Sequence, residues 1–423
     1  MGDGLDGITL LIYLVLVAFG WMNIFAAVYD ADQAWFAFSL NYTKQLLWIG
    51  TAGLIILLII GFDYRTYETF AYLLYGAMLL LLIGVMFFGR EVNGARAWID
   101  LGPIRLQPAE FAKFITALTL ARYLTQPQLR REKLGTLFTA GSIIALPALL
   151  IILQNDTGSA LVFSVFALVL YREGLLPGWF LPGGLGLAAL FVLGLSLTEA
   201  QLFYFLVLPI LSAALLFILS LRKKKLSVIS AALVVAFSLI FFVFSIKYIF
   251  ENFLAPHQKE RILVLLNEDI DPQGRGPRYN LFHSRVAIGS GGFWGKGFLN
   301  GTQTKLNYVP AQSTDFIFCT IGEEHGWVGS FLTIGLFTAL LARLVLLAER
   351  QRDKFVRIYG YSVAGIFFFH FAINIGMTIG LFPVVGIPLP FLSYGGSSLW
   401  SFTILLFIFL KLDAHRDQQM ERK

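Results

Sequence analysis

The chain has 423 residues, of which 57% are apolar and only 14% are charged, and its mean hydropathy is +0.74. Because soluble domains carry about 25% charged residues, this composition excludes a soluble globular protein. The net charge of +6 does not indicate nucleic-acid binding, since the basic residues form short clusters between apolar runs, where they report topology.

Apolar runs long enough to cross a bilayer recur along the chain, and about 20 apolar residues suffice for one helical crossing. They predict an all-α polytopic membrane protein, a bundle of about 10 to 12 transmembrane helices that forms one integral membrane domain over residues 1–423. The candidate spans are 8–29, 45–62, 68–88, 109–124, 136–153, 159–170, 178–197, 202–220, 227–248, 328–348, 357–381 and 398–412. Asp3 and Asp6 stand where a secretory signal needs positive charge, so the first span is expected to be retained.

The basic residues distribute unequally over the connecting segments. If the N-terminus lies inside, the inside segments hold far more Lys and Arg than the short outside loops. The positive-inside rule therefore predicts that both termini are cytoplasmic and that residues 249–327 form one large extracytoplasmic loop. Aromatic residues throughout this loop argue against disorder and predict that it folds back onto the bundle.

The first polar region with candidate chemistry is NGARAWIDLGPIRLQPAEFAK, residues 93–113. Pro108 falls in the first turn of a predicted helix, and Glu110 and Lys113 follow with a spacing that puts them on one helix face. Ionisable groups inside a membrane helix are costly and by default mark a functional interior. The alternative is a structural ion pair that holds the bundle together.

Arg96, Trp98 and Arg105 precede that helix on the outer side. A cationic cluster beside an aromatic ring could hold a phosphate and a sugar. Interfacial Trp and Arg anchors are the common alternative.

A glycine-rich stretch, IGSGGFWGKGFLNGTQ, occupies residues 288–303. Ser290 and Gly297 break the P-loop pattern, and the stretch is predicted to face outward, so we reject a nucleotide-binding loop. What remains is a loop of exposed amides with Lys296, suited to anions or simply to tight turns.

Asp315 stands in the stretch NYVPAQSTDFIFCTIGEEHG, residues 307–326, just before an apolar run. A carboxylate in this setting is expected to lose solvent, which raises its pKa and makes it a better proton acceptor. The alternative is that Thr314 or Asp315 caps a helix beginning at Phe316.

Residues 386–398, GIPLPFLSYGGSS, predict irregular backbone that lines a cavity between two spans. His370 and Asn374 in the preceding span have helical i, i+4 spacing and are predicted to make interhelical hydrogen bonds. No His, Cys and carboxylate cluster has zinc-ligand spacing in the sequence.

Seven segments together resemble the SEDS family of RodA, FtsW and SpoVE proteins: NGARAWIDLG, QPAEFAK, QNDTGSALV, IGSGGFWGKG, GTQTKLNYVPAQSTDFIF, IGEEHG and VVGIPLPFLSYGGSS. They occur in family order between about residues 93 and 398. The GKG–GTQ and VVGIPLPF segments are more similar to the elongation branch, RodA, than to the division branch. Two departures are Ser313, where His is frequent, and His325, where the family has an apolar residue.

The resemblance implies a peptidoglycan glycosyltransferase that polymerises lipid II at the outer face of the cytoplasmic membrane during cell elongation. It also implies that the protein is surrounded by membrane lipids and has a class B penicillin-binding protein as its partner. It implies that Asp315 is the essential loop aspartate. Trp98 matches the tryptophan of the family's NGAR-x-W motif, and Glu110 and Lys113 match its paired membrane residues. For substrate binding we hypothesise that Lys113, Arg96, and Arg105 or Lys296 face the diphosphate and that Glu110 orients Lys113, with Gln303 as a further candidate. The family usually has ten spans, so residues 178–225 are expected to form an extra helix pair.

The implied reaction suits these residue types. A sugar hydroxyl attacks an anomeric carbon whose leaving group is a diphosphate, so one carboxylate base suffices and cations stabilise the departing charge. A divalent cation, Mg²⁺ or Mn²⁺, could assist there, although the sequence shows no dedicated site for one. The alternatives are a lipid II flippase, whose polar groups would line a path across the bilayer, and a scaffold without activity.

Overall fold

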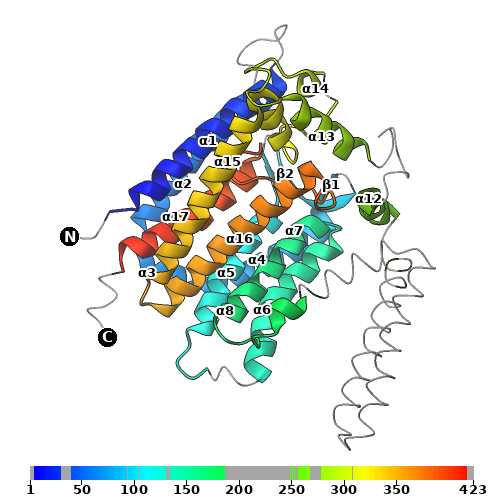
Figure 1. Cartoon of the computed structure of the whole chain (residues 1–423). Coiled ribbons are helices and arrows are strands. Elements are labelled where there is room, and N and C mark those ends of the chain that lie inside the picture. Colours follow the sequence, from blue (N-terminus) through cyan, green and yellow to red (C-terminus); the bar gives the residue numbers. More distant parts are fainter. Residues whose placement is uncertain are drawn as a thin grey trace, which may run out of the picture. The chain divides into compact units, whose positions relative to one another are not determined.

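The computed structural model describes residues 4–29, 40–92, 94–102, 104–129, 134–184, 186, 248, 250, 252, 256–266, 278–306 and 308–416. The chain divides into two compact units, residues 1–177 with 280–423, and residues 178–279. Within the second unit the described helix is α12 (Pro256–Leu266). The other helices and strands, labelled in Figure 1, lie in the first unit. The boundary between the units falls after Tyr279, the first residue of α13.

Seven helices in the described part of the chain are long and apolar enough to cross a membrane. They are α1 (Gly7–Val28), α2 (Asn41–Gly61), α4 (Ala71–Phe88), α6 (Leu134–Leu153), α15 (Ile317–Glu349), α16 (Lys354–Ile379) and α17 (Gly396–Ala414). Each overlaps a predicted span. The prediction of a polytopic helical membrane protein is therefore confirmed.

Shorter helices account for other predicted spans. The predicted span 109–124 is α5 (Pro108–Leu124), with Pro108 in its first turn as expected. The predicted span 159–170 consists of α7 (Thr157–Leu161), the 3-10 helix η1 (Val162–Val165) and α8 (Phe166–Arg172), and α3 (Tyr64–Thr69) joins α2 to α4. Two predicted spans lie outside the described residues: 202–220, and 227–248 apart from Tyr248. The same holds for the expected helix pair 178–225 beyond residue 186.

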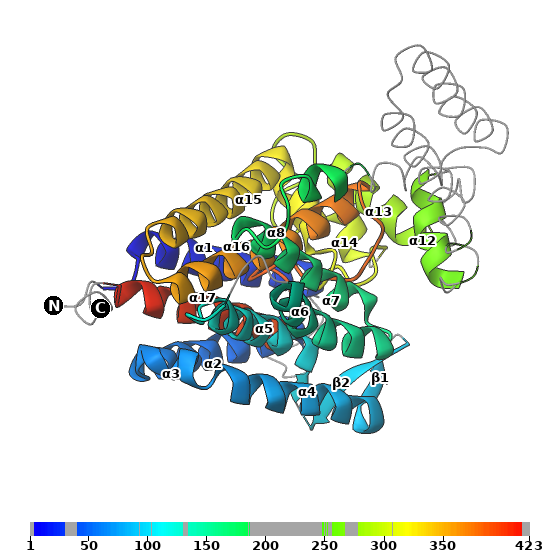
Figure 2. The ribbon, with the colours of Figure 1, turned by 90° about the horizontal axis from the view of Figure 1, so that it is seen from below.

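The centre of the first unit is formed by α5, which packs against α4, α6, α16 and α17. Its buried face includes Ala109, Ala112, Ala117 and Ala121, whose small side chains allow neighbouring helices to approach closely. In the most apolar window of α17, 78% of residues are buried, against 17% in α2. Thus α17 is an inner helix, and α2, which lies at the edge of the bundle in Figure 2, is a peripheral one. Several leucines of α2 are exposed.

A small antiparallel sheet joins α4 to α5 and amends the all-α prediction. Its strands, in the order β1-β2-β3, are β1 (Arg90–Val92), β2 (Ala95–Leu101) and β3 (Ile104–Leu106). Arg90 is paired with Trp98, and Asp100 with Arg105. The strands are too short for a period-2 pattern to stand out beside the long apolar runs, so hydropathy did not predict the sheet.

Helix α15 begins earlier than predicted. The expected span 328–348 is only its second part, since the helix starts at Ile317 and is interrupted by non-helical backbone at Gly326, with φ 63° and ψ −153°. A Cβ at residue 326 would lie 2.3 Å from the backbone nitrogen of Gly295, so glycine is required at this close approach. The predicted large loop 249–327 therefore contains α12, α13 (Tyr279–Ser290), α14 (Thr302–Lys305) and the first turns of α15.

The two ends of α1 identify two opposite ends of the bundle. At its start, Asp6 caps the helix by accepting from Thr9 and also pairs with Arg343 of α15. Near its end, the carbonyl of Ala27 accepts 2.8 Å from Gln312, three residues before Asp315. A 22-residue helix is about 33 Å long, so Asp6 and the Asp315 loop lie at opposite ends of the bundle.

Candidate functional site

The Asp315 loop is held by three consecutive backbone carbonyls. The Ser313 carbonyl accepts 2.8 Å from the backbone nitrogen of Tyr394, and the Thr314 carbonyl accepts 2.6 Å from the Ser393 hydroxyl. The Asp315 carbonyl accepts 2.8 Å from the Asn374 side chain. These bonds join the loop to the irregular segment 386–395, which sequence analysis had expected to line a cavity.

Asp315 stands one residue before the N-cap of α15. That N-cap residue is Phe316, whose side chain makes no capping bond. Asp315 is only partly exposed, and its carboxylate lies beside the backbone of Gly386, where a Cβ would be 3.4 Å from Oδ2. Gly386 has a φ of +72°, which glycine adopts without strain. The carboxylate thus lies beside the irregular segment.

The predicted pair Glu110 and Lys113 is in contact. Lys113 Nζ donates to Glu110 Oε1 at 2.7 Å, and both side chains are almost completely buried, with exposures of 1% and 2%. The same ammonium lies 3.0 Å from His370 Nε2 and 5.3 Å from the Phe402 ring centroid. A charge this deeply buried is stable only when it is paired, as here.

The sheet carries the other predicted outer cations. Arg96 and Arg105 have about half of their side-chain surface exposed and form loose ion pairs with Glu91 at 3.8 Å and Asp100 at 3.6 Å, respectively. Arg90 and Arg105 hold the pKa of Asp100 below its ordinary value. Trp98 lies opposite Arg90 in the register. The structure therefore places Arg96, Trp98 and Arg105 on one small sheet, as the motif spacing suggested.

Lys296 and Gln303 meet a residue that the sequence analysis had not singled out. The fully buried Glu323 carboxylate accepts from Lys296 Nζ at 2.7 Å and from the backbone nitrogens of residues 302, 303 and 304 at 2.8 to 3.0 Å. It also accepts from the hydroxyls of Thr302 and Thr304. The sequence feature that could have pointed to Glu323 is the pair of consecutive carboxylates, Glu323 and Glu324, within an apolar run. The Gln303 side chain lies 3.3 Å from His283 Nδ1.

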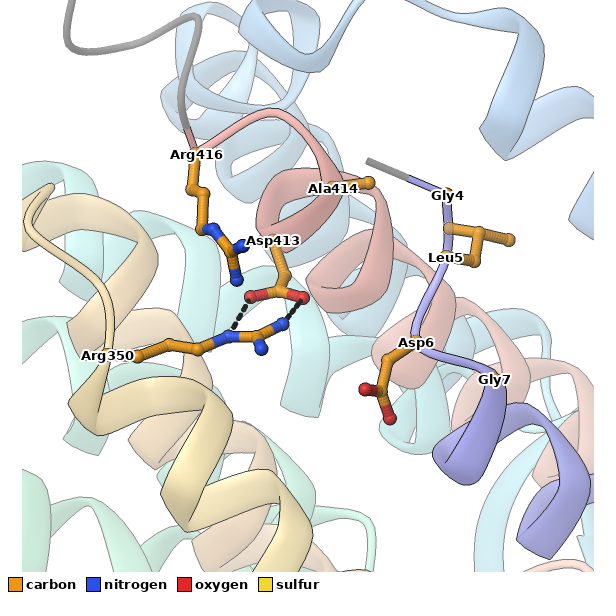
Figure 3. Close-up of a pocket in the computed structure, with 8 residues that line it drawn as sticks. All are labelled: Gly4, Leu5, Asp6, Gly7, Arg350, Asp413, Ala414 and Arg416. Carbon is orange, nitrogen blue, oxygen red and sulfur yellow. Dashed lines mark hydrogen bonds and ion pairs between the residues drawn. The ribbon is translucent and has the colours of Figure 1, made fainter. Parts of the chain in front are cut away.

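A cavity of about 260 Å³ lies at the opposite end of α1, between residues 4–7 and 413–416 (Figure 3). Asp413 accepts from both Arg350, at 2.9 Å for Nε, and Gln351. Asp6 is paired with Arg343 and also accepts hydrogen bonds from Thr9. Together these contacts hold the pKa of Asp6 far below its ordinary value. These carboxylates are engaged in ion pairs that join the first and last helices to α15, so the cavity is structural in character.

The fold and the polar cluster together define a polytopic helical membrane protein with buried ionisable groups near one membrane face. The model of the cell cycle protein family FtsW/RodA/SpoVE matches residues 7–200 and 184–418. The chain is 33% identical to the peptidoglycan glycosyltransferase RodA of Treponema pallidum, covering 97% of this chain and 98% of that protein. It is 31% identical to the peptidoglycan glycosyltransferase MrdB of Escherichia coli K12, with coverages of 97% and 94%.

Among solved structures, one described as a peptidoglycan synthase complex that coordinates polymerization and crosslinking has a chain that matches with a TM-score of 0.69 and 28% identity. The match covers 98% of this chain and 99% of that one. The protein belongs to the FtsW/RodA/SpoVE family and is a multi-pass bacterial membrane protein.

Proposed function

We propose that this chain, a peptidoglycan glycosyltransferase, polymerises lipid II into glycan strands at the outer face of the cytoplasmic membrane during cell elongation. The names of the Treponema and Escherichia relatives support the activity. The observation that carries the assignment to this site is the Asp315 carboxylate, which is partly exposed on a hydrogen-bonded loop at the end of the bundle away from the termini. Cytoplasmic termini would put this loop outside.

In the proposed reaction, a sugar hydroxyl of one lipid II attacks the anomeric carbon of another glycan unit. A new C–O bond forms, the bond from that carbon to the diphosphate breaks, and undecaprenyl diphosphate leaves with the bonding electrons. Asp315 takes the hydroxyl proton. A diphosphate is a good leaving group, so the site needs a base but no second carboxylic acid to protonate it.

The departing diphosphate requires positive charge nearby. Arg96 and Arg105 are half-exposed and only loosely paired, so we propose that they contact the diphosphate, with Trp98 against a sugar ring. Lys113 is buried with Glu110, and the partly exposed Lys296 is paired with the buried Glu323. These pairings support roles in shaping the electrostatic field of the site and in holding its loops. Gln303 is proposed to bind substrate from the same loop. A divalent cation at the diphosphate remains a proposal.

We also propose a class B penicillin-binding protein as the partner. The solved relative with the TM-score of 0.69 is described as a complex in which polymerization and crosslinking are coordinated. A polymerase of this family produces the strands that a transpeptidase crosslinks, so assembly of the two would deliver product directly.

The test is gel-resolved glycan polymerisation from purified lipid II, with a cognate penicillin-binding protein present. Asp315→Asn is expected to lower the rate about 100-fold or more, as for loss of a general base. Asp63→Asn, a change to an exposed carboxylate at the N-cap of α3 that asparagine can replace as a cap, is the matched control and is expected to keep most of the rate. Polymer from Asp315→Asn at the wild-type rate would remove Asp315 from the reaction. No polymer from folded wild type would favour the flippase, to be measured next by lipid II transfer across vesicles.

A further inference from the structure

Two polar side chains of α16, His370 and Asn374, are completely buried in the bundle. They are one helical turn apart and therefore lie on the same face of α16. Buried polar groups are normally hydrogen bonded, so the partners of these two side chains report what the helix face holds in place.

The Asn374 amide joins two loops that are distant in sequence. Its nitrogen donates 2.8 Å to the Asp315 carbonyl and 2.7 Å to the Ile387 carbonyl. Because both partners are acceptors, only the amide nitrogen can make these bonds, and the orientation of the side chain is determined. One side chain thus sets the separation between the Asp315 backbone and the irregular segment.

His370 continues this connection toward α5. Its Nδ1 lies 3.0 Å from the Pro388 carbonyl, and its Nε2 lies 3.0 Å from Lys113 Nζ. An ammonium group can only donate, so Nε2 must present its lone pair, and the ring proton is on Nδ1, where it bonds to Pro388. His370 is therefore a neutral imidazole in one tautomer, held between a buried cation and a backbone carbonyl.

We infer that His370 and Asn374 are positioning residues that set where the Asp315 carboxylate sits, by joining the Asp315 backbone and the backbone of residues 387–388 to the buried Lys113–Glu110 pair. The inference rests on the proposed role of Asp315. Neither side chain touches the reacting atoms.

Gly386 shows why this placement affects the carboxylate. It directly precedes the two bonded carbonyls, and its backbone already lies beside Asp315 Oδ2. A shift of residues 387–388 therefore changes the space next to the carboxylate, while the Asn374 bond fixes the other side of the same contact. Misplacement of a reacting group by about 1 Å can cost about 100-fold in rate.

The experiment measures kcat and KM for lipid II polymerisation by the full chain with its penicillin-binding protein. His370→Met and Asn374→Leu fill similar space without the hydrogen bonds. His370→Gln retains an acceptor for Lys113 and a donor for Pro388. Ser362→Ala is the matched control, because Ser362 is buried in α16 and its hydroxyl bonds only within the helix, to the Ile358 carbonyl. Asp315→Asn is measured in parallel.

We expect His370→Met and Asn374→Leu to lower kcat about 100-fold with KM changed by less than about twofold, because placement of the base acts in the chemical step. His370→Gln should recover most of kcat, and Ser362→Ala should match wild type. The inference is overturned if both breaking variants keep the wild-type kcat, if only KM changes, if Ser362→Ala is equally slow, or if neither breaking variant folds. If Asp315→Asn itself polymerises normally, the proposed role of Asp315 fails instead, and if folded wild type makes no polymer, the proposed function fails.

Discussion

Gly386 lies against the Asp315 carboxylate, so that a Cβ at residue 386 would be 3.4 Å from Oδ2. The two residues are 71 positions apart in the chain. Their contact exists because the irregular segment before α17 and the loop before α15 are hydrogen bonded to each other and to α16. This arrangement makes backbone geometry at residue 386 part of the environment of the proposed base.

The substitution Gly386→Ala is expected to reduce polymerisation more than it reduces stability. At a φ of +72°, a Cβ costs about 1 to 2 kcal/mol, and here it also places a methyl group in van der Waals contact with the carboxylate. Gly174→Ala is the control, since Gly174 has a φ of +78° with open space around it. Thermal unfolding in detergent should fall similarly for both, whereas only Gly386→Ala should slow polymerisation. Equal activities would show that the added methyl contact at Asp315 has no effect.

The Lys113–Glu110 pair is expected to tolerate the loss of both charges better than the loss of one. Lys113→Met leaves Glu110 buried without its cation, which should cost about 3 to 5 kcal/mol of unfolding free energy. The double variant Lys113→Met/Glu110→Gln should recover much of that loss. Arg90→Met, in an exposed pair with Asp100, should cost less than about 1 kcal/mol. Chemical denaturation in detergent measures all three, and a double variant less stable than Lys113→Met would contradict the expectation.

Glu323→Gln should release the loop that contains Lys296 and Gln303. The carboxylate accepts bonds from three backbone amides, two hydroxyls and one ammonium, while an amide group would turn donors toward donors. Each buried donor left unsatisfied costs about 1 to 3 kcal/mol. Limited proteolysis near residues 296–305 is expected to accelerate. Glu324→Gln, whose carboxylate accepts from Leu299 at 3.2 Å, is the control and should change cleavage much less.

The Asp6–Arg343 pair predicts a stability that depends on acid pH. Hydrogen bonds from Arg343 and Thr9 hold the pKa of Asp6 in the folded protein below its ordinary value of 3.8. The folded state therefore prefers the ionised form, so its contribution is complete above about pH 4 and disappears as the pH falls below that value.

Thermal unfolding of wild type and Asp6→Ala, measured in detergent from pH 7 down to pH 3, tests this dependence. The wild type should be more stable at neutral pH by about 0.5 to 2 kcal/mol, the usual range for a lost helix cap. The difference should shrink as the pH approaches 3. A difference that grows toward acid pH would contradict the assigned sign.

Local features of the sequence predicted much of the bundle. Apolar runs located the seven long helices, Pro108 marked the start of α5, and the spacing of Glu110 and Lys113 placed them on one face, where they form the 2.7 Å ion pair. These predictions succeeded because hydropathy and helical periodicity are properties of neighbouring residues.

Other features depended on distant parts of the chain. The apolar span predicted for α15 began only at residue 328, because Glu323 and Glu324 interrupt its apolar run and Gly326 interrupts its helical backbone; the start at Ile317 agrees with the helix beginning at Phe316 that the cap alternative assumed. The role of Glu323 could not be read from its own neighbours, because its hydrogen-bond donors lie about 20 residues earlier, on a loop whose path only the folded chain defines.

The sequence by itself determined the membrane character of this protein, the positions of most spans, and which motifs carry its ionisable residues, since these follow from composition and short-range spacing. Only the tertiary structure decided that His370 meets Lys113 across 257 residues, and that Asn374 joins Asp315 to Ile387. Such contacts arise when helices pack so that most buried polar groups find a partner, and that tendency selects pairs by geometry rather than by sequence separation.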